Sequence, residues 1–176
     1  MRLYVLVTSC DPLRVFIFRD GLVRFTTMRY AEPNENNISN VYMHLTNYAV
    51  QKHSDAFVRD NEEEGTKRRI TTLNHWFKRK GFDLAKIWKC VDEVVVKTLL
   101  SSIAVLKHNY RTCFPNHNLT SACFEILGFD IMFDKKLKPY VLEVSYLSFH
   151  KVLYKCFAKA KRNLKKSQPY DQLLLE

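Results

Sequence analysis

Two acidic residues lie inside apolar segments near the C-terminal end of this 176-residue sequence. Asp130 ends the run 124–130 (FEILGFD), and Glu143 lies within the run 141–144 (VLEV). A charged group inside such a segment is costly unless an opposite charge or hydrogen bonds compensate it. An unpaired carboxylate at either position would therefore be expensive.

A short polar segment joins the two runs, and their spacing predicts an antiparallel hairpin. Side chains alternate between the faces of a strand, and opposed residues of an antiparallel pair have a constant sum of positions. A two-residue turn at 135–136 gives the sum 271, whereas pairing Phe133 with Tyr140 gives 273. Either odd sum places Asp130 and Glu143 on one face, and the second places them directly opposite each other.

Two carboxylates on one face need a cation between them. Oxygen ligands with open coordination positions suit Mg²⁺, above all where nucleotide phosphates complete the coordination. The alternative is that each acid pairs with one of the 28 lysine and arginine side chains. The pattern alone leaves both interpretations open.

Four further residues have side chains suited to a phosphorylated ligand. Arg2 and Arg24 carry guanidinium forks at the ends of apolar segments, which suit phosphate or carboxylate. Thr46 and Asn47 can hydrogen-bond a nucleotide, although a Thr-Asn pair is equally ordinary in turns and helix caps. None of these residues identifies a ligand by itself.

The strands that position these residues are predicted from short apolar runs. Residues 3–7, 15–18 and 22–25 form such runs, and the Asp20-Gly21 pair between the last two predicts a hairpin turn. Two intervening segments are expected to be loops. These are 30–40, rich in asparagine, and the highly charged and mobile 59–69.

Two helices are expected between the strands. A short one covers 72–80 and ends at Gly81, and Asp83 is a suitable N-cap for a longer one that extends to about residue 107. The apolar stripe of the longer helix comprises Ile87, Trp88, Val91, Val94, Val95, Leu99, Ile103 and Leu106. We expect this stripe to pack on one mostly antiparallel sheet, which gives an α+β fold.

Composition limits the kinds of partner and compartment. The net charge of +10 favours an acidic partner: nucleic acid, an anionic membrane, a nucleotide or an acidic protein tail. The sequence opens without a signal peptide, and no apolar run approaches the ~20 residues that span a bilayer. Five widely spaced cysteines indicate a reducing compartment, with the thiols filling the core.

Taken together and in order, these stretches resemble the tubulin tyrosine ligase-like family, most closely its polyglutamylase branch. The resemblance covers roughly residues 2–144. The matching blocks are 2–14 (RLYVLVTSCDPLR), 21–25 (GLVRF), 44–48 (HLTNY), 108–114 (HNYRTCF), 123–130 (CFEILGFD) and 139–144 (PYVLEV).

The resemblance implies the C-terminal part of an ATP-grasp fold and an ATP- and Mg²⁺-dependent ligase. Such an enzyme phosphorylates a glutamate side chain of a tubulin C-terminal tail. The amino group of free glutamate then attacks the acyl phosphate and forms an isopeptide bond. The resemblance also implies a role for each residue that matches a functional position of the family. Asp130 and Glu143 match Mg²⁺ ligands, Thr46 and Asn47 match nucleotide contacts, Arg24 matches an arginine near the phosphates, and Arg2 matches one facing the acyl phosphate.

The sequence departs from the family pattern at both ends. The family's lysine and aspartate just before Arg2, and the lobe that precedes them, have no counterpart here. Where the family carries a metal-binding asparagine, Ser145 follows Val144. We therefore divide the chain into a partial catalytic domain, 1–144, and a divergent basic tail, 145–176. The tail's spacing is compatible with an amphipathic helix.

The expected function is tubulin polyglutamylation in the cytoplasm, on the cytoskeleton, with the cilium or basal body as further locations. The isolated chain is expected to be inactive, because half of the nucleotide cleft is absent. One alternative is a non-catalytic form that binds tubulin or nothing, and another is a tubulin glycine or tyrosine ligase. A nucleic-acid-binding module is disfavoured, because the sequence has no motif of that class.

Overall fold

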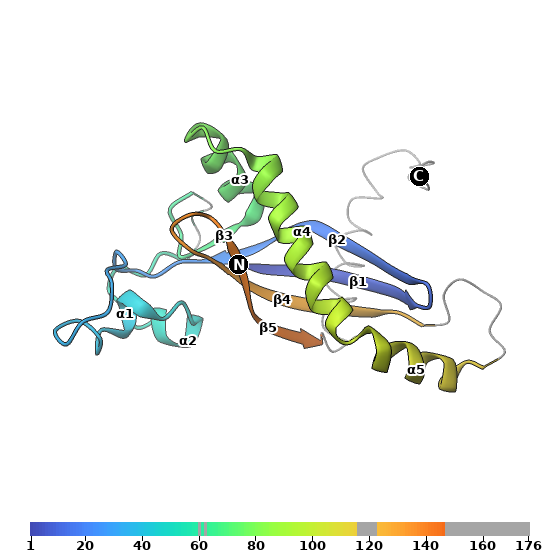
Figure 1. The fold of residues 1–176 in the computed structure, drawn as a ribbon. Helices are drawn as coiled ribbons and strands as arrows, with labels where there is room; N and C mark the ends of the chain where they lie inside the picture. Colours follow the sequence, from blue (N-terminus) through green and yellow to red (C-terminus); the bar gives the residue numbers. More distant parts are fainter. Residues whose placement is uncertain (60, 62, 116–122, 147–176) are drawn as a thin grey trace, which may run out of the picture.

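The computed structural model describes residues 1–59, 61, 63–115 and 123–146. They form an α+β unit in which helices pack on an antiparallel sheet of strand order β3-β2-β1-β4-β5 (Figure 1). The strands are β1 (Arg2–Cys10), β2 (Leu13–Arg24), β3 (Lys67–Arg69), β4 (Glu125–Phe133) and β5 (Pro139–Tyr146). The helices are α1 (Val41–His44), α2 (Tyr48–Gln51), α3 (Ile70–Arg79), α4 (Leu84–Ser101) and α5 (Ile103–Cys113).

The central strand β1 alternates between two faces of the sheet. Leu3, Val5 and Val7 are buried on the face that meets the helices, whereas Arg2 and the alternate positions point to the other face. Phe129 and Ile131 of β4 complete the core on the helical side. The predicted antiparallel sheet is confirmed.

Helix α4 lies across this core face (Figure 1). Its first turn is capped as predicted, because Asp83 Oδ1 accepts a hydrogen bond from the Lys86 backbone N–H at 3.1 Å. The predicted stripe is confirmed at its four buried positions, namely Ile87, Val91, Val95 and Leu99.

The prediction of one helix as far as residue 107 is wrong. The helix ends at Ser101, and α5 starts at Ile103 with no buried residue. The Ser101 hydroxyl donates to the Thr98 carbonyl at 2.7 Å, a local bond of the kind by which serine competes with helical backbone pairing. The break at Ser101 and Ser102 separates Ile103 from the core stripe.

The prediction of a hairpin turn at Asp20-Gly21 is also wrong. Strand β2 runs without a turn from Leu13 to Arg24, and the turn to β1 lies at residues 11–12. Gly21 has φ +157°, and a Cβ there would overlap the Arg2 carbonyl oxygen. The register between β1 and β2 shifts next to it. The glycine thus serves a bulge with close backbone approach.

The segment 59–69 is not entirely a loop. Lys67–Arg69 pair with β2 as strand β3, and the Phe25 N–H donates to the Thr66 carbonyl at 2.7 Å. Helix α3 follows directly and ends before Gly81, which has the left-handed φ of +75°. The predicted short helix and its glycine stop are therefore confirmed.

The cysteine prediction is correct only in part. Cys10 and Cys90 are half-buried, but Cys113 and Cys123 are exposed, and all four are free thiols. Cys156 and the predicted basic tail from residue 147 lie outside the described residues. Among the described helices, none is both long and apolar enough to cross a membrane.

Candidate functional site

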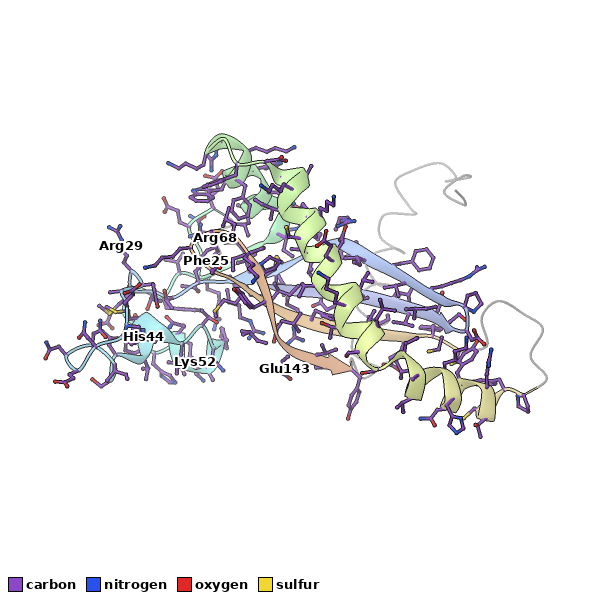
Figure 2. All side chains as sticks on the ribbon, in the orientation of Figure 1. Phe25, Arg29, His44, Lys52, Arg68 and Glu143 are labelled. Atoms are coloured by element: carbon purple, nitrogen blue, oxygen red, sulfur yellow. The ribbon has the colours of Figure 1, made fainter. Side chains whose placement is uncertain are left out.

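Three of the predicted site residues lie in one row across the sheet. Arg2 of β1 is directly opposite Asp130 of β4, and Asp130 is directly opposite Glu143 of β5. Directly opposed residues of a sheet share a face. The row therefore occupies the face that points away from α4, on the edge half of the sheet where Figure 2 labels Glu143.

The predicted opposition of Asp130 and Glu143 is confirmed, but the route to it differs from the prediction. Phe133 pairs with Pro139, so next to the turn the positions of opposed residues add up to the even number 272. A bulge at Leu142 then adds one residue to β5 and restores the odd sum 273 at Asp130. Without this bulge the two carboxylates would not be directly opposed.

Arg2 supplies the cation that the acidic site requires. Its Nε and Nη2 donate to the two oxygens of Asp130 at 2.6 and 2.7 Å, and its Nη1 donates to Ser145 Oγ at 3.3 Å. Gly128 leaves room for this arrangement, because a Cβ there would lie 2.8 Å from Arg2 Nη1. The sequence did not indicate this pairing.

This ion pair perturbs both partners. Hydrogen bonds from Arg2 hold the pKa of Asp130 below its ordinary value, although partial burial acts in the opposite direction. The same contact raises the pKa of Arg2. Arg2 therefore compensates the charge of Asp130 next to Glu143.

The pair should make the stability of the fold depend on acidity. A depressed folded-state pKa stabilises the fold above the unfolded-state value of about 3.9, and this contribution is lost as pH falls through the folded pKa. In Asp130→Asn we expect lower stability at neutral pH and a shallower loss of stability on acidification. Thermal unfolding from pH 7 to pH 2 measures both. Parallel pH profiles for the variant and wild type would contradict this role of the pair.

Glu143 remains available to a ligand on the same face. It is exposed and makes no hydrogen bond or ion pair within the described part of the chain. Its charge contributes to the raised pKa of Arg2, which places it within electrostatic reach of the pair.

Arg24 lies at the end of β2, opposite Lys67 of β3. Alternation puts it on the same face as Leu22, which is opposite Arg2. Its charge also contributes to the lowered pKa of Asp130. The structure thus adds Arg24 to the electrostatic surroundings of the row, without direct contact.

Thr46 and Asn47 occupy the turn between α1 and α2. Figure 1 shows these two short helices beyond the end of β2, away from the body of the sheet. The Asn47 carbonyl accepts the first hydrogen bonds of α2, from Val50 and Gln51, while its side chain makes no cap bond. Within the described residues, no hydrogen bond joins either residue to the row.

No sequence pattern predicted the role of Gln51, which holds this turn in place. Its side chain is buried, with 1% exposure, whereas glutamine is ordinarily a surface residue. Its amide nitrogen donates to the carbonyls of Leu45 and Tyr42, and its oxygen accepts from the Thr27 N–H at 2.8 Å. Gln51 therefore ties the Thr46–Asn47 turn to the segment that follows Arg24.

The donor set fits Mg²⁺ held jointly with phosphates. Asp130 and Glu143 offer hard carboxylate oxygens, with the Ser145 hydroxyl next to them. Among the described residues, no group of three or more acidic, histidine or cysteine side chains could hold a metal alone. Mg²⁺ is commonly bound by only one or two carboxylates together with phosphate oxygens and water.

A comparison with family models matches residues 1–147 to the model described as the tubulin-tyrosine ligase family. Among curated proteins, the chain is 50% identical to mouse tubulin polyglutamylase TTLL6 over 175 residues, 99% of this chain and 21% of that protein. It is 53% identical to mouse tubulin polyglutamylase TTLL13 over 148 residues, 83% of this chain and 18% of that protein.

Similarity extends to a third relative, human tubulin polyglutamylase TTLL7, which is 48% identical over 148 residues, 82% of this chain and 17% of that protein. The chain thus spans about a fifth of the length of these relatives. The match to mouse TTLL6 includes the segment after residue 147. On the family match and these identities, the chain belongs to the tubulin-tyrosine ligase family.

Proposed function

We propose that this chain forms the C-terminal part of the catalytic region of an ATP-dependent tubulin polyglutamylase. The observation that carries the proposal is the row of Arg2, Asp130 and Glu143 on one sheet face, in a member of this family. Relatives that cover most of the chain are named tubulin polyglutamylases.

The role of each residue follows from the family position that it matches. Asp130 and Glu143 would hold Mg²⁺, with Ser145 beside them, and Arg24 would face the phosphates. Thr46 and Asn47 contact the nucleotide, held in place by Gln51. Bound ATP and Mg²⁺ supply the phosphoryl group and the positive charge that phosphoryl transfer requires.

Arg2 has two partners in this scheme. In the structure both oxygens of Asp130 accept from its guanidinium. The phosphate oxygens of an acyl phosphate, or the two oxygens of an acceptor carboxylate, can also accept two hydrogen bonds from a guanidinium fork. We propose that Arg2 is shared between Asp130 and the reacting carboxyl group, and that Asp130 and Glu143 would together hold Mg²⁺.

The partners and location follow from this chemistry. The acceptor is an acidic tubulin tail on microtubules, to which a chain of net charge +10 is attracted, and the donor is free glutamate. Such an enzyme works in the cytoplasm on the cytoskeleton, and in cilia or at basal bodies where stable microtubules concentrate.

One observation favours a second candidate, a tubulin-binding module without ligase activity. Asp130 is already satisfied by Arg2, and Ser145 stands where the family carries an asparagine ligand. In that case the metal site would be weak or unused, and the net positive charge of the chain alone would attract tubulin.

A chimera tests the proposal, with residues 1–146 replacing the matching segment of mouse TTLL6. With ATP and Mg²⁺ we expect it to attach labelled glutamate to microtubules, and to attach neither glycine nor tyrosine. Tubulin from which the C-terminal tails have been removed by protease is the control acceptor. Binding to microtubules without incorporation would favour the non-catalytic candidate.

Ser145→Asn should strengthen metal binding. The longer amide side chain adds a carbonyl oxygen ligand where serine has a short hydroxyl that accepts from Arg2. We expect the Mg²⁺ affinity of the nucleotide-bound chimera to rise by about three- to tenfold, as one added oxygen ligand would give. Calorimetric titration with Mg²⁺ measures it. An unchanged affinity would mean that Ser145 does not face the metal.

A further inference from the structure

A basic surface lies on the helical side of the sheet, around α3. Two adjoining hollows, of about 450 and about 620 Å³, share Glu63, Thr72 and Arg79. Their lining also includes the charged residues Glu64, Arg68, Arg69 and Lys78 and the aromatic residues Phe25 and Trp76. Cationic side chains therefore outnumber acidic ones in this lining.

This surface is separate from the row of Arg2, Asp130 and Glu143. Phe25 packs against the hydrophobic core, which lies on the side of α4, whereas the row lies on the opposite face. Figure 2 labels Phe25 and Arg68 together, apart from Glu143.

Arg68 is held ready to bind an anion. Its Nε donates to the Gly65 carbonyl at 2.8 Å, and its guanidinium carbon lies 4.4 Å from the centre of the Phe25 ring. The cation–π contact and the hydrogen bond fix the fork, so little conformational entropy is lost when a ligand binds. The Nη nitrogens remain for a carboxylate.

Exposed cations and an aromatic floor surround it. Lys78 and Arg79 occupy the last turn of α3, and neither makes an ion pair in the described part of the chain. Trp76 is 41% exposed and stacks on Phe82 with ring centres 6.1 Å apart. Such a flat apolar face suits the methylene groups of glutamate side chains.

The acids in the lining do not neutralise these cations by contact. Within the described residues, Glu63 and Glu64 form no ion pair, and their backbone N–H groups are held by the Asn61 side chain. The arginine guanidinium groups of the hollow can therefore bind an external carboxylate. Repulsion from Glu63 and Glu64 lowers the affinity of the hollow for that carboxylate.

We propose that the α3 hollow, lined by Arg68, Trp76, Lys78 and Arg79, binds a glutamate-rich segment of an acidic polypeptide. That this polypeptide is a tubulin tail rests on the proposed function. A tail tethered here would have a raised effective concentration at the carboxylate row.

Fluorescence anisotropy of a labelled oligoglutamate peptide with the 176-residue chain tests this site. We expect Arg79→Gln to weaken binding by about threefold and Arg68→Gln by about tenfold, since exposed ion pairs contribute less than pre-ordered forks. The double variant Glu63→Gln, Glu64→Gln should strengthen binding by about threefold. Circular dichroism checks that each variant is folded. If Arg68→Gln misfolds, the peptide affinity of Arg79→Gln alone decides the test.

The matched control is Arg14→Gln, an exposed arginine near the start of β2. Figure 1 shows the β1–β2 turn at the opposite end of the sheet from α3. Equal losses of peptide affinity for Arg14→Gln and Arg79→Gln would overturn the site, because they would show that the net charge of the chain determines binding. A single-stranded oligonucleotide that displaces the peptide more effectively than unlabelled oligoglutamate would overturn it in favour of nucleic acid.

The two proposals fail separately. Peptide binding that depends on Arg79, together with a chimera that adds no glutamate, would reject the ligase function but support the α3 hollow. Glutamate addition by the chimera, together with peptide binding insensitive to Arg79→Gln, would reject the hollow alone.

Discussion

Glu143→Gln should lower glutamate addition by the chimera at least about 1000-fold, as expected when a group stabilising the transferring phosphoryl charge is removed. Glutamine keeps the shape of the side chain but removes its negative charge. Because Asp130 is shared with Arg2, Glu143 is the carboxylate of the row without a protein partner among the described residues. Labelled glutamate incorporated per minute at saturating ATP measures the effect.

The control is Glu125→Gln, an exposed acid on β4 that lies opposite Val7 at the far end of the strand. Its loss should change the rate by less than about twofold, as for a surface substitution away from the site. Equal losses for the two variants would indicate that overall charge, not the row, is responsible. Full activity of Glu143→Gln would remove this residue from the metal site.

Phe129→Ala should destabilise the fold by about 3–5 kcal/mol, the usual cost of deleting a fully buried phenylalanine side chain. Phe129 has no exposed surface and belongs to the core cluster with Leu3 and Val95. It also directly precedes Asp130, so collapse around the cavity would disturb the carboxylate row. Urea unfolding of the 176-residue chain gives the change in the free energy of unfolding.

Met132→Ala on the same strand is the matched control. Met132 is 56% exposed, and its truncation should cost less than about 0.5 kcal/mol. A small effect of Phe129→Ala would mean that the sheet and α4 do not share the described core.

The features predictable from sequence were those with a regular pattern. The apolar stripe identified α4, and the apolar runs identified β1, β4 and β5, because burial on one face imposes a fixed period. The shared face of Asp130 and Glu143 followed from that same alternation.

Features that depend on contacts distant in sequence could not be predicted. Asp20-Gly21 is a turn signal locally, yet Gly21 accommodates the Arg2 backbone, and the Asp20 carboxylate accepts from the Thr71 N–H of α3 at 3.2 Å. Strand β3 is a charged segment without an apolar period, because it pairs at the sheet edge. Only tertiary context decides such cases.

The candidate site shows the same division. Residue types and the family resemblance picked out the row, but neither indicated that Arg2 would hold Asp130, or that a bulge at Leu142 would set the register. The burial of Gln51 could not be predicted, because a buried and an exposed glutamine cannot be told apart in the sequence until the backbone partners of the side chain are known.

The central claim is that Asp130 and Glu143 together hold a divalent cation next to nucleotide phosphates. Electron paramagnetic resonance of Mn²⁺, a spectroscopic substitute for Mg²⁺, measures this in the chimera with a non-hydrolysable ATP analogue. We predict that the double variant Asp130→Asn, Glu143→Gln binds Mn²⁺ at least about tenfold more weakly than the parent, since both charged ligands are lost. Equal Mn²⁺ affinity in the two proteins would contradict the claim.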